Sequence, residues 1–179
     1  GAPDLDLPTA VVALEAPTAA ERFAAERWLA LRSELSHAFD RAGIPLLVLK
    51  GGSYLDTLYA DPAERPMGDL DVLVRPGDME RAIAALARLG FAVPSNKPHA
   101  RAATHHAISL GRKGIGVDLH RHMLQAGRSH IDIEGCWARA TLGDHRLAPL
   151  DEAALHVAHL LRHELMVPLM GYVDLGRLL

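Results

Sequence analysis

Two aspartates stand two residues apart in the segment Gly68-Asp69-Leu70-Asp71-Val72. Because alternate side chains of a strand share one face, Asp69 and Asp71 lie side by side, while Leu70 and Val72 face the core. Neighbouring like charges repel, so a cation is expected between them. Paired carboxylates suit Mg²⁺ or Mn²⁺, which take further oxygen ligands from substrate phosphates. Taken alone, the pair is equally the pattern of solvated residues on an edge strand.

A glycine turn upstream offers groups that bind phosphate. Lys50 follows a short apolar run, and Gly51, Gly52 and Ser53 lead into a helical pattern. Backbone amides at the start of a helix attract phosphate, and glycine permits close approach. Arg65 precedes the aspartate strand and offers a bidentate contact to phosphate. Lys50 can reach the same phosphates or neutralise the aspartates. An ordinary strand-to-helix turn and a solvated loop arginine remain open alternatives.

A third carboxylate lies on another predicted strand. Asp118 stands between Val117 and Leu119, which face the core, so Asp118 joins the face of the aspartate pair if the two strands are neighbours. Three carboxylates around two metal ions are the usual apparatus for in-line nucleotidyl transfer. Asp118 also has the chemistry of a general base toward an acceptor hydroxyl. His120 shares its face and is expected to orient Asp118 or to contact phosphate.

Three motifs together carry a resemblance to a known family. They are Leu49-Lys50-Gly51-Gly52, Arg65-Pro66-Met67-Gly68-Asp69-Leu70-Asp71-Val72-Leu73-Val74 and Val117-Asp118-Leu119-His120. This pattern resembles the bacterial uncharacterised nucleotidyltransferase family within the DNA polymerase β-like nucleotidyltransferase superfamily, over roughly residues 40–179. The C-terminal run, with Asp174 ahead of two leucines, is similar to that family's helical segment.

The resemblance implies an enzyme that moves a nucleoside monophosphate from a nucleoside triphosphate to an acceptor and releases pyrophosphate. The acceptor is an unidentified small molecule or protein. Asp69 and Asp71 would hold Mg²⁺ or Mn²⁺, and Asp118 would complete the site. The triphosphate would be bound by Gly51, Gly52 and Ser53.

Two other functions stay open. The first is a non-catalytic nucleotide-binding or adaptor domain on the same fold, with a degenerate site. A separation of more than roughly 8 Å between Asp118 and the aspartate pair, or burial of the Asp118 face, would favour that function, since two-metal sites hold their ions about 4 Å apart. The second is a metal hydrolase in which Asp118, His120 and His122 bind zinc, iron or manganese.

The sequence patterns around these residues predict an α+β fold, with a small mixed sheet flanked by helices and a helical C-terminal part. Helical spacing covers residues 18–43, 54–59 and 78–89, and short strands are expected at 45–49 and 69–74. Strand patterns at 105–110 and 115–120 predict a hairpin. Residues 125–148 have an irregular pattern, and Asp151 is expected to cap a helix that begins at Pro149 and breaks at Pro168.

The domain organisation follows from these elements. Residues 1–17 are a loose lead-in, residues 18–149 form the nucleotidyltransferase-like core, and residues 150–179 form a helical segment. The segment ends without a stop signal, so we expect a partner helix to be missing after Leu179. The apolar C-terminal helices also favour a homodimer.

Composition excludes several classes. Hydrophobic residues make up 49% of the 179, and charged residues 23%, so the chain can bury a core and is not disordered. A formal net charge of −3 argues against nucleic acid as a partner. The single cysteine, Cys136, rules out an internal disulfide and fits a cytoplasmic location. Neither a membrane-spanning run nor a secretory signal is present, so we expect no membrane partner.

Overall fold

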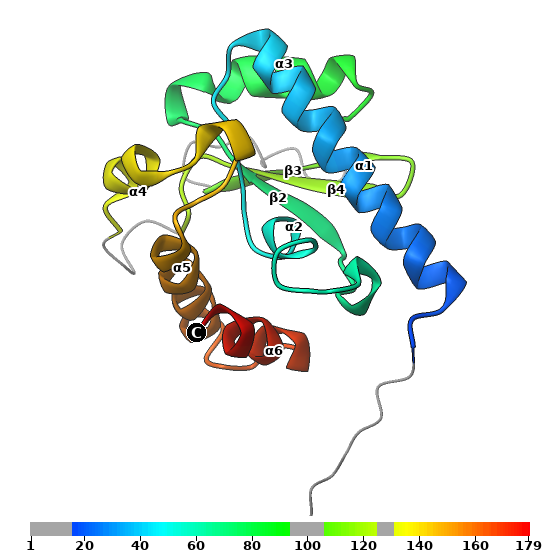
Figure 1. Cartoon of the computed structure of the whole chain (residues 1–179). Helices are drawn as coiled ribbons and strands as arrows, with labels where there is room; N and C mark the ends of the chain where they lie inside the picture. The colour runs from blue at the N-terminus through cyan, green and yellow to red at the C-terminus, as the bar shows by residue number, and fades with distance from the viewer. Residues whose placement is uncertain (1–15, 94–105, 125–130) are drawn as a thin grey trace, which may run out of the picture.

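The computed structural model describes residues 16–93, 106–124 and 131–179, so most of the predicted lead-in lies outside the described part (Figure 1). The helices are α1 (Ala19–Ala42), α2 (Gly51–Tyr54), α3 (Met79–Arg88), α4 (Ile133–Arg139), α5 (Pro149–Arg162) and α6 (Leu169–Leu178). The strands are β1 (Leu47–Val48), β2 (Asp69–Leu73), β3 (Ala107–Arg112) and β4 (Ile115–His120). Single 3₁₀ turns cover Pro62–Glu64, Pro76–Asp78 and Leu142–Asp144. The predicted α+β fold is confirmed.

Helix α1 begins and ends at sequence signals. Thr18 and Glu21 form a capping box at its start, each side chain accepting from the other residue's backbone N–H. Gly43 ends the helix in the left-handed conformation, at φ 60°, which glycine adopts without a steric penalty. The predicted boundaries, 18 and 43, are therefore confirmed.

The sheet places the two aspartate-bearing strands side by side. Its strand order is β1-β2-β4-β3, in which β2 and β4 run parallel and the other pairs are antiparallel. The parallel register sets Asp71 directly opposite Asp118. Since residues opposite each other in a sheet share a face, the condition attached to the Asp118 prediction is met.

Helices cover the two faces of the sheet differently. On one face, Leu70 and Val72 join the larger core with α1 and α3. On the other face, Leu47, Leu49 and Leu73 form a second core with Cys136 and Trp137 of α4 and Leu155 of α5. Helices α5 and α6 therefore lie on the same side as the aspartates, as Figure 1 shows with these helices below the sheet.

Three local predictions are wrong. Helix α2 begins at Gly51, three residues earlier than expected, and stops at Tyr54. Residues 133–139 form α4, whose short length leaves little periodicity in the sequence. Ala148, not Asp151, occupies the N-cap of α5, and Asp151 instead forms an ion pair with Arg139 at 2.8 Å. The predicted hairpin is confirmed from residue 107 onward, and residue 105 lies outside the described residues.

A buried carboxylate fastens α6 to the rest of the fold. Asp174 has no exposed surface; it accepts from the Tyr59 hydroxyl at 2.5 Å and from Arg65 Nη2 at 2.7 Å. His156 of α5 bonds to the carbonyl of Gly171 at 2.7 Å, which links the two C-terminal helices.

The C-terminal part exposes three large apolar side chains, those of Leu161, Met166 and Leu169. The homodimer expected through these helices stays a prediction. Among the described helices, none combines the length and the apolar character that crossing a bilayer demands.

We expect Gly52→Ala to lower the free energy of unfolding by about 1–3 kcal/mol, since overpacking a dense core forces backbone shifts. A methyl group at this position would lie 2.3 Å from Leu70 Cδ1 and 2.8 Å from Val48 Cγ1. Urea denaturation measures the change. Gly77→Ala is the matched control, because nothing lies within 4 Å of its added carbon. Equal stability of both variants would show that the α2–sheet contact tolerates a methyl group.

We expect Asp174→Asn to destabilise the protein by about 3 kcal/mol or more, because removing one partner of a buried ion pair leaves the other charge uncompensated. Asp144→Asn serves as the control: this aspartate is exposed, and exposed substitutions usually change stability by less than about 0.5 kcal/mol. Denaturant midpoints of both variants test the difference, and a change in Asp174→Asn no larger than in the control would contradict it.

Candidate active site

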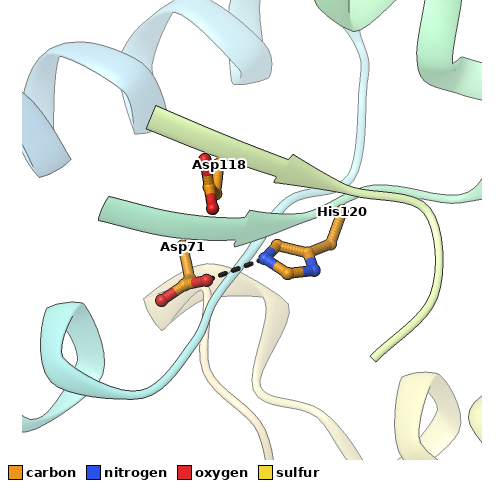
Figure 2. Close-up of side chains that lie close together, drawn as sticks. All are labelled: Asp71, Asp118 and His120. Atoms are coloured by element: carbon orange, nitrogen blue, oxygen red, sulfur yellow. Dashed lines mark hydrogen bonds and ion pairs between the residues drawn. The ribbon is translucent and has the colours of Figure 1, made fainter. Parts of the chain in front are cut away.

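The carboxylates of two neighbouring strands meet in one cluster. Ligand atoms of Asp71, Asp118 and His120 all lie within 4.8 Å of one another. Figure 2 shows the two carboxylates projecting from the parallel strands, with the imidazole turned toward Asp71. Asp118 therefore lies well within roughly 8 Å of Asp71, the separation beyond which a degenerate site was expected.

Asp71 is the most constrained member. Its side chain is buried, and a single oxygen, Oδ1, accepts from Lys50 Nζ at 2.8 Å and from His120 Nε2 at 2.7 Å. Burial alone would raise the pKa of Asp71, but the His120 hydrogen bond and the Lys50 charge hold that pKa well below its usual range. The carboxylate is therefore anionic at neutral pH. His120 was expected to orient Asp118 or to contact phosphate, and its imidazole bonds to Asp71 rather than to Asp118.

Asp69 lies outside this compact cluster but on the same wall. It begins β2, two residues before Asp71, and lines the same cleft. Partial withdrawal from water raises the pKa of Asp69, and the negative charges of Asp71 and Asp118 add to that rise. A bound cation would relieve this repulsion.

The predicted phosphate turn divides into two halves. Lys50 and Gly51 line the cleft. Gly52 faces Val48 and Leu70 of the sheet. Ser53 is buried, and its hydroxyl donates to Glu152 of α5. The backbone N–H of Ser53 donates to the Lys50 carbonyl at 2.9 Å. Only the first half of the turn thus faces the space where a ligand would lie.

Arg65 covers Gly51 and is held by α6. A carbon added to Gly51 would lie 2.4 Å from Arg65 Nη1, so the guanidinium sits directly over the glycine. Arg65 pairs with Asp174 at 2.7 Å and still lines the cleft. A larger residue at position 51 would therefore displace the Arg65 guanidinium.

Helix α5 closes the cleft on a side that the sequence did not predict. The cavity measures about 580 Å³, and His159, Arg162 and His163 line it opposite the aspartates. Burial, the Lys50 charge and His163 lower the pKa of His159 to about 4, so this imidazole is neutral at pH 7. The sequence does contain a signal for this wall: His159, Arg162 and His163 are spaced i, i+3 and i+4, which puts them on one face of a helix.

His122, the remaining predicted metal ligand, is exposed beyond the end of β4.

The cleft therefore combines an anionic floor with cationic sides. Asp69, Asp71 and Asp118 supply the floor, and Lys50 and Arg65 flank it at the glycine turn. Such a site can hold a divalent cation together with a polyphosphate, because each compensates the charge of the other.

Comparison with known proteins agrees with this chemistry. A search of curated proteins gives no significant match, and a search of solved structures gives none either. A family model described as "Uncharacterised nucleotidyltransferase" matches residues 4–179, nearly the whole chain. The chain that holds these aspartates therefore belongs to the uncharacterised nucleotidyltransferase family.

Proposed function

We propose that this protein transfers a nucleoside monophosphate from a nucleoside triphosphate to an acceptor, in a reaction that depends on Mg²⁺ or Mn²⁺. The observation that carries the proposal is the cluster of Asp71 and Asp118 on parallel strands, beside the Lys50–Gly51 turn, in a chain of a nucleotidyltransferase family.

The donor chemistry of the cluster fits a divalent cation. Two carboxylates and an imidazole lie within reach of one ion, and both hydrogen bonds to Asp71 use Oδ1. In the described part of the chain no side chain donates to Asp118, and His120 Nδ1 is buried without a partner. We assign Asp69, Asp71 and Asp118 to the cation, with His120 holding Asp71 in place. When bound, the ion neutralises charge on the phosphate oxygens.

The chain's own residues then have separate tasks. Lys50, Gly51 and Arg65 bind and orient the triphosphate, with Gly52 and Ser53 shaping the turn. An acceptor oxygen attacks the α-phosphorus, an O–P bond forms, and the bond to the departing pyrophosphate breaks. Asp118 takes the acceptor's proton. Pyrophosphate leaves with the bonding electron pair, which balances the transfer.

The geometry favours this activity over the alternatives. An adaptor with a degenerate site has no need for carboxylates within 4.8 Å of each other in a cleft. A hydrolase built on Asp118, His120 and His122 would need His122 in the cluster, whereas that residue is exposed outside it.

We expect Asp71→Asn and Asp118→Asn to abolish magnesium-dependent binding of α,β-methylene-ATP, whose α–β bridge cannot be cleaved. Loss of a ligand should exceed the roughly 10- to 100-fold loss typical of outer-sphere partners. Calorimetric titration with and without Mg²⁺ measures it, with Asp144→Asn as control. If the parent protein binds no nucleoside triphosphate in the presence of Mg²⁺ or Mn²⁺, the proposed function is wrong.

We expect His120→Ala to weaken Mn²⁺ binding by roughly 10- to 100-fold, because the imidazole orients the Asp71 carboxylate. Electron paramagnetic resonance of free Mn²⁺ measures binding without any need for turnover. His122→Ala is the matched control, since this exposed histidine lies two residues further along the chain. Equal Mn²⁺ affinity in the two variants would remove His120 from the site.

A further inference from the structure

Arg162 is a cation of the cleft that the proposed function leaves without a task. Lys50 is paired with Asp71 and Arg65 with Asp174. Arg162 is half-buried, and within residues 16–93, 106–124 and 131–179 no carboxylate forms an ion pair with it. Its side-chain hydrogen bond runs from Nη1 to His106 Nε2, at 3.2 Å. The guanidinium therefore keeps donors for a ligand, since it carries five N–H groups.

The fold places Arg162 at the far end of the cleft from the glycine turn. The order β1-β2-β4-β3 puts the turn after β1, the aspartates on β2 and β4, and His106 next to the start of β3. Through its bond to His106, Arg162 stands over the β3 edge. The carboxylates thus lie between two cationic ends, one at Lys50 and Arg65 and the other at Arg162.

Arg162 shares its part of the cleft lining with the imidazoles of His106, His159 and His163. Burial and the neighbouring Arg162 lower the pKa of His106, which agrees with its Nε2 accepting a hydrogen bond from the guanidinium. His159 and His163 are packed edge to face, with ring centroids 4.6 Å apart. Arg162 carries a permanent charge at this end of the cleft, which Ser109 of β3 also lines.

We propose that Arg162 binds an oxyanion of the acceptor, so that the acceptor is an anionic molecule bearing a phosphate or a carboxylate. This inference rests on the proposed function, which assigns the opposite end of the cleft to the triphosphate. A planar guanidinium binds either oxyanion through paired N–H donors. An acceptor held there presents its hydroxyl to Asp118, which lies between Arg162 and the glycine turn.

The test uses hydroxyl-bearing probes with different charge. Glycerol 3-phosphate and glycerate carry the two oxyanions, and glycerol carries none. Each is titrated into the full chain saturated with α,β-methylene-ATP and Mg²⁺, and also into the chain alone. Arg162→Gln removes the charge, Arg162→Lys retains it without the planar fork, and Arg88→Gln is the matched control on the exposed surface of α3. Thermal melting checks that the variants are folded.

We expect at least one anionic probe, and not glycerol, to bind the parent protein. Arg162→Gln should weaken that binding about tenfold or more, as loss of a charge-assisted hydrogen bond implies. Arg162→Lys should restore part of it, and Arg88→Gln should have no effect. Nucleotide affinity should change less than about twofold in Arg162→Gln. Whether phosphate or carboxylate binds more tightly identifies the kind of anion.

Other outcomes separate the two proposals. If Arg162→Gln weakens nucleotide binding and leaves the probes unchanged, Arg162 belongs to the triphosphate and the inference is overturned. Absence of any Arg162-dependent probe binding overturns it as well. If instead the parent protein fails to bind nucleotide but binds an anion through Arg162, the anion site stands and the proposed function fails.

Discussion

One oxygen atom of a buried side chain, Oδ1 of Asp71, connects the elements on which the site depends. It accepts from Lys50, which follows β1, and from His120, which ends β4, while Asp71 itself belongs to β2. Burying a carboxylate costs several kcal/mol unless partners compensate its charge. Removing one partner of a buried ion pair destabilises a protein by more than the intact pair stabilises it. The charge therefore fixes where the turn, the two parallel strands and the imidazole stand relative to one another. The remaining carboxylates occupy positions that this arrangement defines.

Much of the fold and part of the site could be predicted, because their signals are local in the sequence. The alternation around Asp69 and Asp71 reports which side chains face water, and the same alternation places Asp118 on that face. Capping at Thr18 and the left-handed Gly43 likewise act within a few residues of the helix ends they define. Adjacency of β2 and β4 was a condition that sequence alone could not supply, since strand order depends on packing between distant segments.

What could not be predicted comes from contacts between segments far apart. Arg65 meets Asp174 across 109 positions, and the Ser53 hydroxyl meets Glu152 across 99. A glycine turn looks the same in sequence whether its residues bind phosphate or pack against other side chains. Only the structure shows that Gly51 lies beneath Arg65 and that Gly52 packs against the sheet. Helix α4 is short, and its stability depends on burying Cys136 and Trp137 rather than on a periodic pattern.

Helix α5 has a consequence for how this family could diverge. Leu155 is buried in the core, and His159 and Arg162, one and two turns further along the same face of the helix, line the cleft. Since a helix rises about 5.4 Å per turn, one face of α5 packs in the core at Leu155 and lines the cleft nearer its C-terminal end. Selection can therefore change the cleft-lining residues, and with them the molecules that bind, while buried Leu155 and Leu160 keep the helix packed against the core. Specificity can evolve on this helix without being limited by the stability of the domain.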